Sequence, residues 1–331
     1  MQILKAPNYD FLKLRGYGLA LSLAVIGSGL ALMAARGGLP LGIDFSGGTI
    51  VIVKFQDAVS QDAVRDALNT VSNEKVVQAY GDPSAREVLI RLPQMSGVEE
   101  GASLEAGSTA VVAALGQSNL GSFDVLSTEI VGPVIGAELQ RRGVYATLAS
   151  LGGILAYVAF RFRLSFAVGA VVAVFHDILV TLAFLAFFGY ELSLNVVAAL
   201  LTITGYSVND TIVIFDRVRE NLRSMRRDAL PEVINASINQ TLARTIITST
   251  TTGMAVLALF LFGGEVLRGF AFTMLVGIIS GTYSTVIIAS SIVVLLTQRR
   301  VASGRNAAGS TASQARNQKQ AKKAKARARA S

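Results

Sequence analysis

An aspartate deep inside an apolar stretch is the residue of this chain whose type and position most clearly indicate chemistry. Asp210 follows Asn209 within the stretch Leu192–Phe215, which is long enough to cross a membrane as a helix. Charged side chains in a membrane span are costly, so they usually face the interior of a helix bundle and serve a function. Asp210 is therefore the first candidate for a functional residue.

Polar residues extend this signal as two stripes along apolar helices. The first stripe shares a helix side with Asp210 and comprises Asn195, Thr202, Tyr206 and, further on, Arg217. The second lies on the next apolar segment and comprises Arg244, Thr248, Thr251 and Thr252. Asp210 lies about 9 Å from the inner end of its helix, and Arg244 lies near the inner end of the next, so their depths are similar. The two side chains can pair if these helices adjoin.

A carboxyl group beside a guanidinium in such a setting can exchange a proton. Removal from water disfavours an ionised carboxyl group, whereas a neighbouring guanidinium favours it, and the opposed effects can leave the group poised to titrate. Movement of Arg244 would then load or unload a proton on Asp210. The alternative is a static ion pair that only fixes the register of the two helices.

His176 and Asp177 form a second candidate pair near the middle of the apolar segment Leu164–Tyr190. Imidazole titrates near neutral pH, so a proton relay is one interpretation. A packing histidine beside an aspartate that bonds to a neighbouring helix is the other. Adjacent residues of a helix point about 100° apart, so these two need not touch each other.

Composition and missing motifs exclude several classes of site. The chain has 331 residues, no cysteine and one histidine, which excludes disulfide scaffolds, thiolate or histidine-cluster metal sites and cysteine nucleophiles. The phosphate-loop, His-Glu-x-x-His and Gly-x-Ser-x-Gly motifs are absent from the sequence, which argues against a nucleotide-driven motor or a hydrolase. We expect no enzyme, no metal and no cofactor, with protons as the coupling ion.

Six apolar segments are long enough to span a membrane and would position these residues. The chain is 52% hydrophobic and 16% charged, with a mean hydropathy of +0.52, whereas about a quarter of the residues of a soluble domain are charged. The segments are Tyr17–Ala35, Gly143–Phe160, Leu164–Tyr190, Leu192–Phe215, Thr245–Gly263 and Gly269–Thr297. Gly277 and Gly281, with Ser280 and Ser284, would permit close helix packing in the last of them.

Basic residues predict how these spans are oriented. Residues 1–16 carry Lys5, Lys13 and Arg15 and are placed in the cytoplasm, so that 17–35 is an uncleaved first helix. Helices two to six lie within 143–297, and their connection 216–244 is also cytoplasmic. The tail 298–331 has ten Lys or Arg and no acidic residue. It is either disordered and solvated or a surface for lipid headgroups or the ribosome.

The external segment 36–142 predicts a small α+β domain with the order β-α-β-β-α-β, which is typical of a ferredoxin-like unit. Its expected strands and helices are 42–54, 60–71, 76–80, 88–92, 109–115 and 122–130. Gly47 and Gly48 read as a turn or bulge rather than a phosphate-binding loop. The predicted fold class is a polytopic α-helical membrane protein with six transmembrane helices and this domain between the first and second.

Four stretches resemble the SecD/SecF family of protein-export membrane proteins, which belongs to the resistance-nodulation-division superfamily. They are residues 42–49, 175–177, 205–221 and 239–245. The resemblance implies an accessory subunit of the Sec translocase in the bacterial inner membrane. Such a subunit pairs with SecD, acts beside SecYEG, and uses the proton motive force to assist preprotein translocation.

The resemblance also assigns expected roles to individual residues. Asp210 and Arg244 match the proton pathway of the family, and Asp44, Gly47 and Gly48 match its external-domain motif. A further group could relay protons or only satisfy polar neighbours: His176, Asp177, Asn209, Tyr206 and Thr248. Two other functions stay open, a structural scaffold for a partner that alone carries protons, and half of a proton-driven small-molecule exporter.

Overall fold

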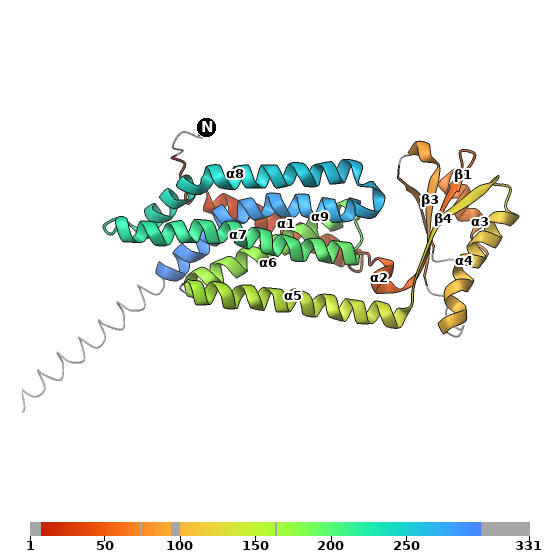
Figure 1. Ribbon diagram of the computed structural model, residues 1–331, viewed down its shortest axis with the longest axis horizontal. Coiled ribbons are helices and arrows are strands. Elements are labelled where there is room, and N and C mark those ends of the chain that lie inside the picture. Colours follow the sequence, from red (N-terminus) through yellow and green to blue (C-terminus); the bar gives the residue numbers. More distant parts are fainter. Residues whose placement is uncertain (1–7, 73–74, 82, 94–99, 163, 299–331) are drawn as a thin grey trace, which may run out of the picture.

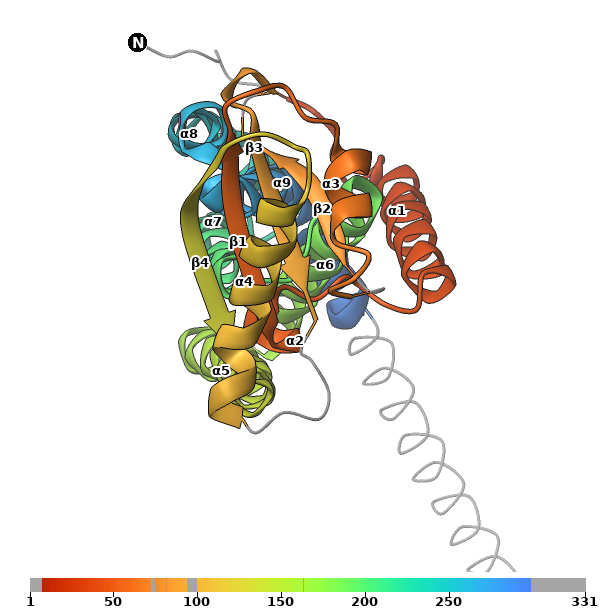
Figure 2. The ribbon, with the colours of Figure 1, turned by 90° about the vertical axis from the view of Figure 1, so that its right-hand side faces the viewer.

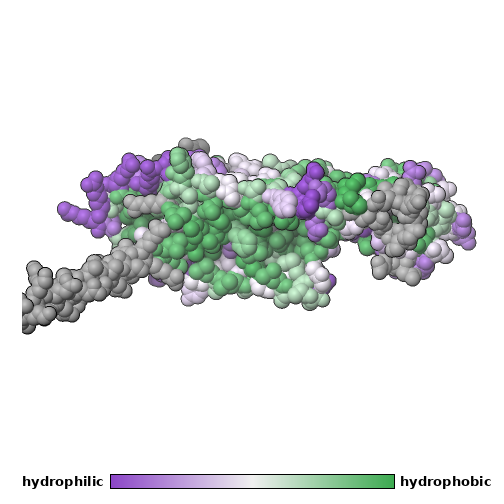
Figure 3. All heavy atoms as spheres, turned by 90° about the horizontal axis from the view of Figure 1, so that it is seen from below, coloured by the Kyte–Doolittle hydropathy of each residue, from purple (hydrophilic) through white to green (hydrophobic). Residues whose placement is uncertain are grey.

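The protein consists of a bundle of long helices with a small sheet domain at one end (Figure 1). The computed structural model describes residues 8–298 apart from 73–74, 82, 94–99 and 163. Within these residues, six helices are long and apolar enough to cross a membrane: Arg15–Ala35, Val134–Arg161, Leu164–Phe188, Leu194–Ser224, Leu230–Phe262 and Val266–Gln298. Hydrophobic residues cover most of the visible side of the bundle (Figure 3). This arrangement confirms the predicted fold class, while the basic tail from residue 299 lies outside the described residues.

The helices that form the bundle are α1 (Arg15–Ala35), α5 (Pro133–Arg161), α6 (Leu164–Phe188), α7 (Leu194–Ser224), α8 (Leu230–Phe262) and α9 (Gly264–Ser284). Four of them, α1, α5, α7 and α8, are longer than the apolar segments expected from the sequence. A π-helical turn, η2 (Thr285–Ala289), interrupts the last span, and such turns are frequent at functional sites. Helix α5 begins at Pro133, ten residues before the expected span, because proline at the first helical position starts a helix favourably.

The connection 216–244 is helical for most of its length. Side chains join the ends of α7 and α8 across it: Arg217 donates to Gln240 at 2.5 Å, and Asn221 donates to Ser237 and Gln240, both at 2.9 Å. These bonds replace contacts with water, so polar residues continue both helices beyond the apolar stretches.

The sheet domain has the predicted order of elements. Its strands are β1 (Gly48–Phe55), β2 (Val76–Tyr80), β3 (Glu87–Leu92) and β4 (Phe123–Val131), and its helices are α3 (Gln61–Ala67) and α4 (Glu100–Gln117). A 3-10 turn, η1 (Pro83–Ala85), links β2 to β3. The antiparallel order is β2-β3-β1-β4, which is that of a ferredoxin-like sheet. Helices α3 and α4 cover the face directed away from the bundle (Figure 2).

Gly47 and Gly48 form the turn between the short helix α2 (Ile43–Ser46) and β1. Both have positive φ values, of 69° and 126°, a region that L-residues with a Cβ rarely adopt. A Cβ at Gly48 would lie 2.5 Å from the backbone oxygen of Leu92 on the neighbouring strand. The turn therefore requires glycine for its backbone conformation and for the close approach of two strands.

We expect Gly48→Ala to lower the free energy of unfolding of the sheet domain by about 1–3 kcal/mol, through backbone strain and the contact with Leu92. Thermal unfolding and limited proteolysis of the full chain in detergent would measure it. Gly116→Ala is the matched control, because Gly116 lies in α4 with no heavy atom within 4 Å of the added Cβ. Equal unfolding of the two variants would contradict the requirement for glycine.

Candidate functional site

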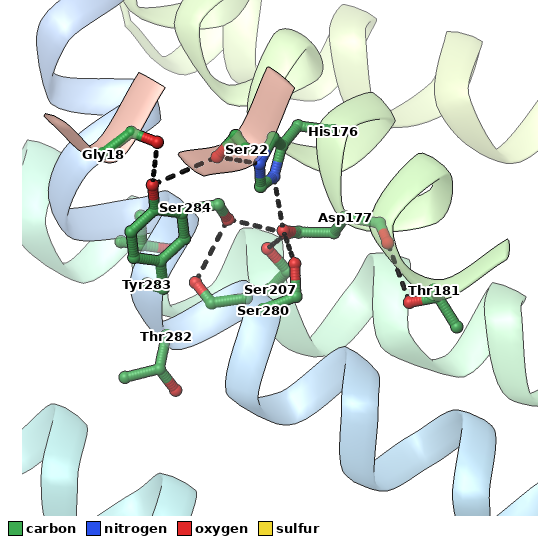
Figure 4. A network of polar contacts seen from close by, with 12 residues as sticks. Gly18, Ser22, His176, Asp177, Thr181, Ser207, Ser280, Thr282, Tyr283 and Ser284 are labelled. Atoms are coloured by element: carbon green, nitrogen blue, oxygen red, sulfur yellow. Dashed lines mark hydrogen bonds and ion pairs between the residues drawn. The ribbon is translucent and has the colours of Figure 1, made fainter. Parts of the chain in front are cut away.

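Asp177 lies at the centre of a buried polar cluster that joins three helices (Figure 4). Its side chain on α6 is 1% exposed. Three serine hydroxyls donate to its carboxylate: Ser207 of α7 at 2.6 Å, and Ser280 and Ser284 of α9, both at 2.7 Å. A buried carboxylate is tolerated only when hydrogen bonds replace those lost to water. The three serines meet that need and fix α6, α7 and α9 relative to each other.

His176 extends this cluster to α1. Its Nδ1 lies 3.2 Å from Asp177 Oδ1, and its Nε2 lies 2.8 Å from Ser22 Oγ. Ser22 also hydrogen-bonds to Tyr283 of α9 at 3.0 Å, and Tyr283 donates to the backbone oxygen of Gly18 at 2.5 Å. The two neighbouring residues of α6 thus touch each other, and their hydrogen bonds connect four helices.

Asp210 occupies a different position on α7 and is only partly satisfied. Its side chain is buried, and Oδ1 accepts a hydrogen bond from Thr245 of α8 at 3.0 Å. Its Oδ2 is buried without a hydrogen-bond partner, as is the hydroxyl of Tyr206 one turn earlier. An unsatisfied buried carboxylate oxygen is costly and calls for an explanation. Oδ2 can accept a proton without breaking an existing bond.

The expected pair between Asp210 and Arg244 is not formed in this structure, because Thr245 takes the place of the guanidinium. Consecutive helical residues point about 100° apart, so when Thr245 faces Asp210 its neighbour is directed aside. Arg244 is exposed and lines a cleft that also contains Asp216 and Arg217. It forms no ion pair with Asp210 at 4.0 Å or less.

The remaining polar candidates lie on an exposed face of the bundle. Asn209 and Thr248 are both exposed, and the Thr248 hydroxyl donates to the backbone oxygen of Arg244 at 3.0 Å. Helix α7 contacts both α5 and α8, and of the six spans these two have the smallest share of buried residues. The described part of the chain therefore leaves polar groups of its spans uncovered.

Helix α7 links the two sites within one turn. Ser207 bonds to Asp177, Asp210 bonds to Thr245, and Thr211 lies 3.0 Å from Thr285 of the π-helical turn. Close packing supports these bonds, since Gly277 faces the Ile203 side chain. A displacement of α7 would thus change its contacts with α6, α8 and η2 together.

The external-domain motif attaches to the start of α7. Asp44 accepts a hydrogen bond from the backbone nitrogen of Leu194, the first residue of α7, at 2.8 Å. The backbone nitrogen of Gly42 donates to Leu192 at 2.8 Å, and Arg91 of β3 forms an ion pair with Glu191. A carboxylate at the N-terminus of a helix accepts a hydrogen bond from a free N–H group and interacts favourably with the positive end of the helix dipole. The sheet domain is thereby tied to the helix that carries Asp210.

Several residues of the buried cluster were not predicted as site residues. The sequence indicates Ser280 and Ser284 only as small packing residues, although their spacing of four places both hydroxyls on one helix side. Ser22, Ser207 and Tyr283 of this cluster, and Thr245 beside Asp210, carry no distinctive spacing. Among the described residues, no group of three His, Cys, Asp or Glu could hold a metal ion.

Comparison with known proteins gives a consistent result. The family description "Protein export membrane protein SecD/SecF, C-terminal" matches residues 111–299, and "SecD/SecF GG Motif" matches residues 33–59. The protein translocase subunit SecF of Desulfurispirillum indicum is 44% identical over 288 residues, which cover 86% of this chain and 90% of the relative. That of Escherichia coli O157:H7 is 39% identical over 293 residues, with coverages of 88% and 89%.

Solved structures show the same similarity. The crystal structure of SecDF, a translocon-associated membrane protein from Thermus thermophilus, matches with a TM-score of 0.74 and 37% identity over 88% of this chain. SecDF in its super-membrane-facing form matches with a TM-score of 0.67 and 38% identity over 92% of this chain. The matches cover 39% and 41% of those longer chains.

Proposed function

Because the chain belongs to the SecD/SecF family, on the SecF side of it, and is thus an accessory subunit of the Sec protein translocase, we propose that it uses proton movement across the membrane to assist preprotein export. SecD is the partner that the similarity to SecDF supports. SecYEG and the exported preprotein complete the proposed assembly. The membrane is the bacterial inner membrane, with both chain ends in the cytoplasm, where the basic tail can meet lipid headgroups or the ribosome.

The half-satisfied carboxyl group of Asp210 carries this proposal. It is buried in a membrane-spanning helix and has one oxygen free of hydrogen bonds. Thr245 holds the other oxygen, while Arg244 next to it remains free to approach. Proton uptake would favour the arrangement with Thr245, and proton release would favour one in which the guanidinium moves toward the carboxylate. The two protonation states thus select different contacts between α7 and α8.

The proposed partner SecD covers the exposed face of α7 and α8 that carries Asn209 and Thr248. Asn209 and Thr248 would then lie between the two halves, beside Asp210. Polar groups in a membrane are best satisfied at such a protein interface rather than against lipid. Tyr206, whose hydroxyl has no hydrogen-bond partner here, lies one helical turn before Asp210 and could take part in moving protons to it.

Movement of α7 provides the mechanical link to the external domain. Asp44 is hydrogen-bonded to the first residue of α7, so a shift of that helix would displace the segment that leads into β1. One proton crossing a potential of 100 mV releases about 2.3 kcal/mol. This energy biases a two-state equilibrium by about fiftyfold. Such a bias is sufficient to prevent backward sliding of an unfolded preprotein, as in a ratchet, but is small for pulling the chain against a large force.

The test is preprotein translocation in vesicles that contain SecYEG, the translocation ATPase, SecD and this chain. We expect a proton gradient to accelerate the completion of translocation severalfold, and a protonophore to remove the acceleration. Vesicles without this chain and SecD are the control. Equal rates with and without the gradient in complete vesicles would contradict proton coupling and favour the scaffold function.

A further inference from the structure

A cleft rich in arginine lies at the end of the bundle remote from the sheet domain, where hydrophilic residues gather (Figure 3). Its volume is about 710 Å³. Five arginines and two acidic residues line it: Arg161, Arg217, Arg219, Arg223, Arg244, Asp216 and Glu220. Five positive and two negative charges leave a formal excess of three positive charges around one open space.

The two acidic residues are already engaged. Asp216 accepts a hydrogen bond from Arg161 at 3.1 Å, and Glu220 accepts one from Arg217 at 2.6 Å. Within the part of the chain that the structure describes, the guanidinium groups of Arg219 and Arg223 have no such carboxylate partner. Two of the three excess charges therefore lie with Arg219 and Arg223, one helical turn apart on α7, and the third is Arg244 of α8.

An adjoining cavity gives the cleft an apolar side. This cavity of about 460 Å³ shares Arg161, Arg219 and Arg223 with the cleft, and its other lining residues are Phe162, Phe166 and Leu222. Phe160, in the last turn of α5, is 93% exposed. The three shared arginines thus border both spaces, and the second space adds aromatic and aliphatic side chains at the end of the bundle.

We propose that this cleft binds an anionic phospholipid, with Arg219 and Arg223 holding the phosphate and the cavity beside Phe162 receiving the start of the acyl chains. Guanidinium forks match phosphate oxygens in two-point hydrogen bonds. Basic pockets between membrane helices are suited to acidic headgroups. The aromatic lining favours a phospholipid over a soluble phosphate, because acyl chains can pack against Phe162 and Phe166 whereas a free phosphate ion has no apolar group to bury there. This lipid site does not depend on proton coupling by Asp210.

The test is lipid binding by the full chain in complex with SecD, measured by native mass spectrometry with titrated dioleoylphosphatidylglycerol. The variant is Arg219→Gln with Arg223→Gln. The matched control is Arg226→Gln with Arg227→Gln, which removes the same charge from residues that line neither cavity. We expect the first pair to weaken phosphatidylglycerol binding about tenfold or more, and the control pair to change it less than about twofold. Dioleoylphosphatidylcholine binding should change with neither.

Three results would overturn the proposal. Equal weakening by both pairs would show diffuse attraction to the basic surface. Displacement of the lipid by millimolar inorganic phosphate would show a site for a soluble anion. Lipid binding to the chain alone but not with SecD would show that the cleft is a contact of the partner. Unchanged thermal unfolding of both pairs is expected, since all four residues are exposed.

Discussion

Asp210→Asn is expected to abolish the acceleration of preprotein translocation by a proton gradient, while the subunit still folds and assembles with SecD. Asparagine keeps the shape and an oxygen that can accept the bond from Thr245, so the free energy of unfolding should change by less than about 1 kcal/mol. It cannot gain or lose a proton at physiological pH. Translocation in vesicles, with and without the gradient, measures the loss.

Two control variants separate the proton from other effects. Asp228→Asn removes the same charge in the exposed connection between α7 and α8, and it should leave the response to the gradient unchanged. Thr245→Val removes the hydrogen bond to Asp210 but keeps the acid, so the response should weaken without disappearing. A full response in Asp210→Asn would show that the partner alone carries the protons and that this chain serves as a scaffold.

The sequence is sufficient to predict that Asp210 is a buried acid, but not which side chain contacts it. A single acid in an apolar run stands out because its burial is costly. Whether Arg244 or Thr245 faces it depends on a helix rotation of about 100°, and composition does not determine this rotation. The sequence likewise does not predict the helical connection between α7 and α8, because a polar stretch is helical only when it has a packing partner.

The buried cluster around Asp177 shows a different limit. Serine is common in membrane helices, where it often supports close packing, so Ser207, Ser280 and Ser284 give no individual signal. Their shared target becomes visible only when α6, α7 and α9 are placed together. The alternation of strands and helices in the external domain, by contrast, is local and was predicted correctly from its pattern and turn residues.

Asp177→Ala is expected to lower the free energy of unfolding by about 3–5 kcal/mol, the largest effect on stability of any change considered. It removes the acceptor of three serine hydroxyls and one contact of His176 in a site excluded from water, and each unsatisfied buried group carries its own penalty. Thermal and denaturant unfolding of the purified complex in detergent would measure the change. Asp228→Ala, at an exposed site, is the control and should be nearly neutral.

Asp177→Asn then separates an anchor from a proton relay. The amide keeps one acceptor oxygen, and a serine hydroxyl can rotate to accept from its NH₂ group, so most of the stability should return. If Asp177 only anchors α6, α7 and α9 to each other, this variant should also keep the response of translocation to a proton gradient. A stable Asp177→Asn complex that no longer responds to the gradient would instead place Asp177 and His176 of α6 on the proton path. They would then act together with Asp210, which lies on α7 about one turn after Ser207, the residue that bonds to Asp177.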